Sequence, residues 1–191
     1  MKLEIRSVVG SEDKNRVRNP QWVLKPQDLV VALKLHTLGS TVLPYARLGA
    51  ALFMSQFEAH AAVQRLLAAG LVTRMAGRTR PVIASLRNFI INGAIYAYPA
   101  VHGEVTIGVP TAQAVAPLKD LLVGTSEMPP VWPDAHGETR GQALMPLYPT
   151  VPRAVQTDPA LWELLALFDA LRIGQARERN LAGRLLEERL A

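Results

Sequence analysis

The sequence has no cysteine among its 191 residues. This excludes disulfide bonds, thiolate catalysis and cysteine-ligated zinc, and it fits a reducing compartment, so we expect a cytoplasmic protein. The N-terminal residues have no apolar segment typical of a signal peptide. No later run approaches the roughly 18 apolar residues of a membrane span. We therefore expect no membrane partner.

Motifs for catalysis are missing too. No serine lies in a G-x-S-x-G elbow, and no glycine-rich loop continues into Lys-Ser or Lys-Thr, as a P-loop would. Asp134, His136 and Glu138 alternate as metal ligands on a strand would, but polar loop residues beside Gly137 are the simpler interpretation. We predict no enzyme, no catalytic residue, no metal and no cofactor.

Charged residues are few, and their distribution is uneven. The chain carries 21 Lys and Arg against 16 Asp and Glu, a net charge of +5. Between Lys25 and Arg80, only Asp28 and Glu58 oppose the basic residues. Those are Lys25, Lys34, Arg47, Arg65, Arg74, Arg78 and Arg80. This local excess favours a polyanion as partner, and a solvated basic surface without a ligand is the alternative.

The same region predicts three short helices. Pro26 and Pro44 suit the first turns of two of them, and apolar residues recur at helical spacing after each. Ser55 has the position of an N-cap with Glu58 three residues later, and Gly70 suits the end of the third helix. In that third helix we expect a core side of Phe57, Ala61 or Ala62, Val63, Leu66 and Leu67, and outward or flanking positions for Gln56, Ala59, His60, Gln64 and Arg65.

A basic hairpin is predicted directly after the third helix. Arg74, Arg78 and Arg80 surround Gly77, and β-branched residues lie on both sides. Arginines on a protruding hairpin suit phosphates or a narrow minor groove, whereas a helix fits the major groove and offers side chains to base edges. The order of three helices and a basic hairpin therefore indicates a nucleic-acid reader, for which duplex DNA is favoured over RNA.

The segments KPQDLVVALKL and YARLGAALFMSQFEAHAAVQRLLAAGLV, with the arginine-rich hairpin, resemble the winged helix-turn-helix domains of bacterial transcriptional regulators, in particular the MarR-like group. The resemblance covers roughly the first half of the chain. It implies that the third helix enters the major groove. The DNA-binding residues predicted for helix and hairpin are Ser55, Gln56, His60, Gln64, Arg65, Arg74, Arg78 and Arg80.

The boundaries that we predict are an N-terminal arm at 1–20, which a frayed terminus would also explain, a winged-helix domain at 21–92, a proline-rich segment at 93–157 and a helical hairpin at 158–191. After the hairpin we expect a helix that ends at Asn92 and Gly93, followed by a short aromatic strand.

In the proline-rich segment we expect that strand to hold Tyr96 and Tyr98, the stretch GEVTIGVPTA to form another, and Trp132 to be a buried anchor. This half resembles uncharacterised bacterial proteins that join a winged helix to such a segment, and the resemblance implies no site.

The C-terminal part predicts two helices. Asp158 and Pro159 begin an apolar helix that ends at Gly174, and a second helix with alternating charges keeps an apolar strip. A regulator that reads a two-fold operator needs a dimer, so we predict a homodimer with these helices as its contact. The alternative is that they pack only against their own domain.

The sequence as a whole predicts an α+β, mostly α, fold: a winged helix-turn-helix domain, a proline-rich segment and a C-terminal helical hairpin. The predicted function is sequence-specific binding of double-stranded DNA, as a transcriptional repressor or autoregulator that occupies its operator. The alternative is a winged-helix module that binds a protein partner, as an antitoxin-like or adaptor subunit. That module would show an exposed apolar patch near Tyr96, Tyr98 and Trp132 and no positive face on the recognition helix.

Overall fold

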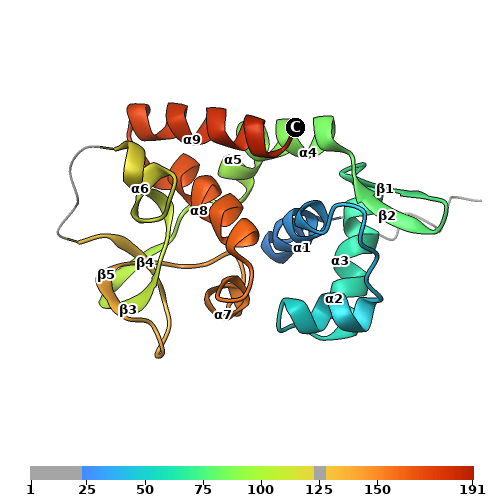
Figure 1. Ribbon diagram of the computed structural model, residues 1–191, viewed down its shortest axis with the longest axis horizontal. Helices are drawn as coiled ribbons and strands as arrows, with labels where there is room; N and C mark the ends of the chain where they lie inside the picture. The colour runs from blue at the N-terminus through green and yellow to red at the C-terminus, as the bar shows by residue number, and fades with distance from the viewer. Residues whose placement is uncertain (1–22, 123–127) are drawn as a thin grey trace, which may run out of the picture.

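The computed structural model describes residues 23–122 and 128–191, which form an α+β fold made mostly of helices. Residues 26–81, which form helices α1 to α3 and the hairpin β1–β2, lie together at one end, and the strands β3 to β5, within residues 102–144, lie at the other (Figure 1). Helix α8 (Pro159–Ile173) lies between them. The predicted arm at 1–20 is outside the described residues.

The first half contains the elements that the sequence predicts, in the predicted order. Helices α1 (Pro26–Thr37), α2 (Tyr45–Ala51) and α3 (Gln56–Ala68) are followed by the strands β1 (Val72–Met75) and β2 (Arg78–Pro81). The two strands pair antiparallel. Helix α3 packs against both α1 and α2, so its position is fixed from two sides.

Local signals set the ends of α3 and the turn of the hairpin. The Ser55 hydroxyl accepts a hydrogen bond of 3.1 Å from the Glu58 amide, as the predicted N-cap requires. Gly70, just past the last turn of α3, has a φ of +69°, which favours glycine. In the hairpin, both Ala76 and Gly77 have positive φ, as a tight two-residue connection needs.

The expected end of the next helix at Asn92 and Gly93 is wrong. Helix α4 (Ile83–Phe89) continues through a π-helical turn (Ile90–Ala94) into α5 (Ile95–Ala97), so the expected aromatic strand is helical instead. Ile90 and Ala94 are buried, and this packing keeps the chain helical across a glycine that propensity alone disfavours.

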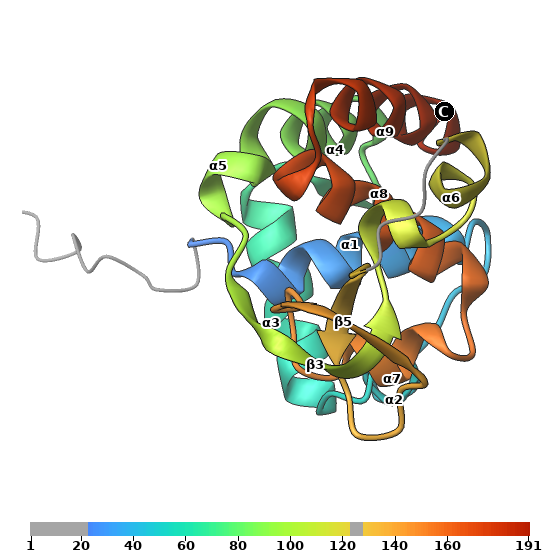
Figure 2. The same ribbon diagram turned by 90° about the vertical axis from the view of Figure 1, so that its left-hand side faces the viewer.

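The second half holds a small three-stranded sheet. Strand β3 (His102–Pro110) pairs antiparallel with both β4 (Pro130–Pro133) and β5 (Thr139–Leu144), which run parallel to each other where they meet. The expected strand over GEVTIGVPTA is thus confirmed by β3. The strands lie in front of the helices when viewed from their own end (Figure 2).

Short helical elements connect this sheet to the rest. A 3₁₀ turn (Ala112–Ala114) and α6 (Leu118–Leu121) follow β3, and α7 (Val151–Val155) follows β5. The 3₁₀ turn packs on α8, as does α7, so both ends of the proline-rich segment are anchored on one helix.

The two C-terminal helices form as predicted, and they are part of the core. Helix α8 (Pro159–Ile173) begins with the Asp158 carboxylate accepting from the Leu161 amide at 3.0 Å, and α9 (Ala176–Arg189) packs against it. Helix α8 also packs against α1, and its apolar residues are buried almost throughout. One continuous core therefore joins both halves of the chain.

A buried carboxylate ties α8 to the second half. Asp169 accepts hydrogen bonds of 2.7 Å from the Thr111 hydroxyl and 2.7 Å from the Trp132 indole N–H, and it forms an ion pair with Arg172. Trp132 is only 1% exposed, which confirms the expectation of a buried anchor. The group is fully hydrogen-bonded, as a buried charge requires.

Candidate nucleic-acid interface

Helix α3 has one buried and one exposed face. Its buried residues include Ala59, Ala62, Val63 and Leu66, which face α1 and α2. Successive residues of a helix are rotated by about 100°, so the remaining positions form one strip. That strip holds Gln56, Phe57, His60 and the half-buried Gln64.

The structure corrects three positions predicted for α3. Phe57, expected in the core, is 77% exposed, and Ala59, expected outside, is fully buried. Arg65, expected at an outward or flanking position and as a DNA-binding residue, is only 5% exposed. Phe57 and Ala59 are two positions apart, so at about 100° per residue they lie on opposite sides of the helix and only one of them can face α1 and α2. The small Ala59 does so, and Phe57 faces the solvent.

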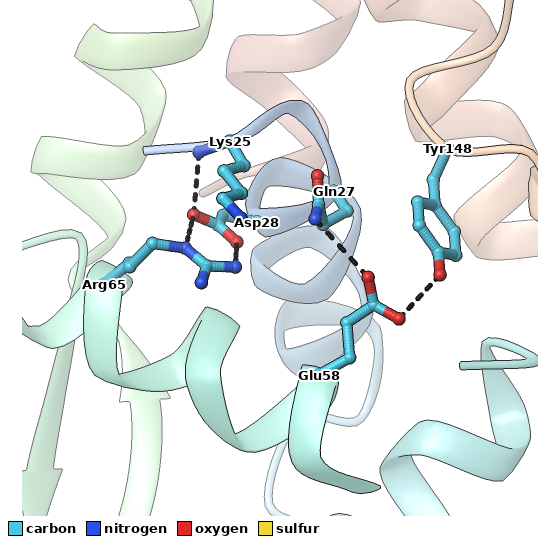
Figure 3. A network of polar contacts seen from close by, with 6 residues as sticks. All are labelled: Lys25, Gln27, Asp28, Glu58, Arg65 and Tyr148. Carbon is cyan, nitrogen blue, oxygen red and sulfur yellow. Dashed lines mark hydrogen bonds and ion pairs between the residues drawn. The ribbon is translucent and has the colours of Figure 1, made fainter. Parts of the chain in front are cut away.

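Arg65 is buried because it pairs with a carboxylate of α1. Its Nε donates to Asp28 Oδ2 at 2.7 Å and its Nη2 to Asp28 Oδ1 at 2.5 Å, a bidentate pair (Figure 3). The hydrogen bonds that the guanidinium donates to Asp28 raise the pKa of Arg65 above its usual value. Asp28 also accepts from the Lys25 amide at 2.8 Å. Arg65 thus fixes α3 on α1 and is turned away from the exposed strip.

The hairpin places its predicted arginines outside. Arg74, Arg78 and Arg80 are all exposed, and the Arg74 guanidinium donates to the Tyr45 hydroxyl at 3.0 Å. Tyr45 in turn meets the His60 ring edge to face, with the ring centres 4.9 Å apart. Tyr45 therefore links the hairpin to the exposed strip of α3.

These residues border an open groove of about 520 Å³. Its walls come from the loop before α2, from α3 and from the hairpin, with Tyr45, His60, Arg74 and Thr79 among the lining residues. The groove and the exposed strip together offer guanidinium, imidazole, amide and hydroxyl groups for hydrogen bonds, beside apolar groove residues that include Leu35, Val42 and Leu43.

The positive charge of this region is less than the sequence count indicates. Arg65 is neutralised by Asp28, and Lys34 pairs with Asp158 of the C-terminal part at 2.6 Å. Four arginines of this region are nevertheless exposed, one on α2 and three on the hairpin: Arg47, Arg74, Arg78 and Arg80. This surface is therefore still basic, and its charge comes from the hairpin more than from α3.

The second half holds the start of α3 in place, which the sequence did not predict. Tyr148 donates a hydrogen bond to the Glu58 carboxylate at 2.6 Å (Figure 3), and Thr150 donates to the Leu52 carbonyl at 2.6 Å. The Arg153 guanidinium lies 3.9 Å from the ring centre of Phe53. These contacts fix the turn between α2 and α3 and the first turn of α3.

Ser55 and Glu58 have the spacing of a capping box, in which the Glu58 carboxylate would also accept from the Ser55 amide. Among the hydrogen bonds of the described residues only the Ser55 half of this arrangement is formed. The second carboxylate oxygen of Glu58 accepts a long bond of 3.4 Å from Gln27. Because Glu58 lies between α1 and the second half, it joins three parts of the chain.

Other predicted sites are placed as follows. The Asp134 carboxylate accepts from the His136 amide at 2.7 Å, and no group of three His, Asp or Glu within 23–122 and 128–191 is arranged to hold a metal ion.

The apolar strip of α9, including Leu185, Leu186 and Leu190, is buried within the chain. The terminal helices therefore do not offer the apolar contact on which the dimer prediction was based.

No helix in the described part of the chain has both the length and the apolar character needed to cross a membrane. No family model, no curated protein and no solved structure matches the chain. The functional argument therefore depends on the residues of this surface and their geometry.

Proposed function

We propose that this protein is a winged helix-turn-helix regulator that binds double-stranded DNA in a sequence-specific way and represses transcription by occupying its operator. In this proposal α3 is the recognition helix and the hairpin β1–β2 is the wing. Gln56, His60 and Gln64 contact base edges, Ser55 caps the helix, and the three hairpin arginines contact phosphates.

One observation carries the proposal: a strip of hydrogen-bonding side chains on α3 lies beside a hairpin whose arginines are all exposed. Glutamine side chains suit the donor and acceptor pattern of adenine, and arginines suit phosphates. Arg65 is no longer among the base-reading residues, because its guanidinium is held by Asp28.

A recognition helix of this kind reads only a few base pairs, so a full operator requires two copies on neighbouring half-sites. We therefore propose that the protein acts on DNA as a homodimer. The buried apolar strip of α9 is not the contact between the copies.

The test is a binding measurement on the DNA upstream of its own coding sequence, compared with unrelated DNA of equal length. Fluorescence anisotropy at about 50 mM and 200 mM salt separates phosphate contacts from base contacts, because only the former weaken steeply with salt. We expect selective binding that persists at the higher salt. Gln64→Ala should lose this selectivity, whereas Arg140→Ala, which removes an exposed arginine of β5, should bind as the wild type does.

Equal affinity for both fragments, or no binding at all, would reject sequence-specific regulation. A loss in Arg140→Ala as large as in Arg78→Ala would mean that binding follows overall charge and not the hairpin surface.

A second candidate is a module that binds a protein partner, and exposed apolar residues favour it. Val105 is 40% and Ile107 44% exposed on β3, and Tyr96 is exposed as well. Trp132 and Tyr98, which the sequence suggested for such a patch, are buried. A partner that is captured by the wild type and lost in Ile107→Asp, together with no DNA selectivity, would favour this function.

A further inference from the structure

The side chain of Phe57 is the largest apolar group on the exposed strip of α3. It is 77% exposed, although most core residues of the same helix are buried completely. Burying a Phe side chain gains roughly 1.5–3 kcal/mol, so leaving one in water forgoes stability that the fold could have used. Single exposed apolar side chains are common on protein surfaces, so the place of Phe57 on the candidate recognition helix, and not its exposure alone, carries the argument.

The neighbours of Phe57 are polar. His60 and Gln64, three and seven positions further on, share its face, and the Gln64 amide lies 3.3 Å from the His60 ring nitrogen. Gln56, before it, is also exposed. Phe57 is thus one apolar spot inside a strip of hydrogen-bonding groups, unlike the continuous apolar patch of a protein interface.

The DNA major groove has a matching surface. Its base edges are donors and acceptors, and its apolar feature is the C5 methyl group of thymine. Phe57 is the second residue of α3, and the N-terminal residues of a recognition helix are those that contact base edges. The exposed Arg74, Arg78 and Arg80 supply the charge complementarity that favours DNA over an apolar protein surface.

We propose that Phe57 is a specificity-determining residue that packs against a thymine methyl group, so that the operator contains a required thymine beneath the first turn of α3. This inference rests on the proposed function. It adds a residue that recognises a base without a hydrogen bond, and it restricts the class of sequence that the protein binds.

The test uses DNA in which single thymines of the bound fragment are replaced by deoxyuridine, which lacks only the C5 methyl group. Binding is measured for the wild type, for Phe57→Ala and for Tyr96→Ala, which removes an equally exposed aromatic side chain of α5. We expect one thymine whose replacement weakens the wild type about fourfold, the factor for burying one methyl group. The same replacement should have no effect on Phe57→Ala.

Tyr96→Ala should respond to deoxyuridine as the wild type does. Thermal unfolding of Phe57→Ala provides the folding control, and because the side chain is exposed we expect no loss of stability. Equal deoxyuridine effects in the wild type and Phe57→Ala, or no effect at any thymine, would overturn the inference and leave the proposed function standing. Weaker binding of Phe57→Ala that does not depend on any methyl group would indicate a wedge between base pairs and would overturn it as well. If the wild type binds no DNA, the proposed function fails and this inference fails with it.

Discussion

The phenol of Tyr148 donates a hydrogen bond of 2.6 Å to the carboxylate of Glu58, 90 positions earlier in the chain. Glu58 lies in the first turn of α3. Tyr148, which precedes α7, therefore fixes the N-terminal end of α3, where Gln56 and Phe57 lie. The bond raises the pKa of Tyr148 to about 12, because the nearby carboxylate favours the protonated phenol. A side chain of the second half thus takes part in positioning the candidate interface.

We expect Tyr148→Phe to lower the free energy of unfolding by about 1 kcal/mol at neutral pH, the net value of a typical hydrogen bond. The pKa of Tyr148 is raised from 10.0 to about 12 in the folded protein, so the folded state holds the phenolic proton more tightly. The contribution is therefore complete below pH 10.0 and is lost as the pH rises through about 12. Urea unfolding from pH 8 to about 12 measures it.

Burial raises the pKa of Tyr98 to about 12 as well, so some alkaline loss of stability should remain in Tyr148→Phe. The variant should lose less stability than the wild type over this range. An identical pH dependence in both proteins would contradict the assigned role of the Tyr148 hydrogen bond.

Removing Arg65 should destabilise the fold and should not relax sequence specificity. Arg65→Ala leaves the Asp28 carboxylate buried without its guanidinium, for which we expect a loss of about 3–5 kcal/mol in the free energy of unfolding. The double variant Asp28→Leu with Arg65→Met removes both charges and should be closer to the wild type. A stable, folded Arg65→Ala protein that has lost only its preference among DNA sequences would restore Arg65 as a base-reading residue.

Much of this arrangement follows from local signals in the sequence. Pro26, Ser55, Gly70 and Asp158 mark helix ends in ways that depend only on nearby backbone, and the structure has those ends. The sequence did not predict the burial of Arg65, because a basic residue on a helix is expected to be exposed. Its partner Asp28 lies 37 positions earlier, and no local pattern connects the two residues.

Contacts between segments far apart in the sequence also explain the other differences between the predicted and the observed structure. The π turn at Ile90–Ala94 depends on tertiary packing, and no local signal marks it. Tyr148, Thr150 and Arg153 reach the turn before α3 from the far half of the chain, and their spacing carries no motif. The exposure of Phe57 could have been noticed from Ala59, since only one of the two positions can face α1 and α2.

The Asp169 group should be needed for the second half to pack. Asp169→Ala would leave the Arg172 guanidinium, the Thr111 hydroxyl and the Trp132 indole without their shared acceptor, and we expect a loss of about 3–5 kcal/mol. Tryptophan fluorescence during urea unfolding reports it. Thr111→Val, which removes one donor and keeps the ion pair, should cost less, about 1–2 kcal/mol. Equal losses in the two variants would mean that the hydroxyl, and not the charge, is the essential part.

Single substitutions should show that the hairpin contacts phosphates and that α3 contacts base edges. An arginine that contacts one phosphate contributes about one unit to the slope of log affinity against log salt. Arg78 is exposed on β2 beside the tight turn, so Arg78→Ala should flatten this slope by about 0.9 and weaken all sequences alike.

Gln64→Ala should instead leave the slope unchanged and cost roughly 1–3 kcal/mol on the preferred sequence only. Anisotropy titrations at four or more salt concentrations, on the preferred and on an unrelated fragment, measure both quantities. If Gln64→Ala changed the slope, or if Arg78→Ala weakened only the preferred sequence, the assignment of phosphate contacts to the hairpin and base contacts to α3 would have to be reversed. Both side chains lie outside the buried core, so neither outcome would come from a loss of folding.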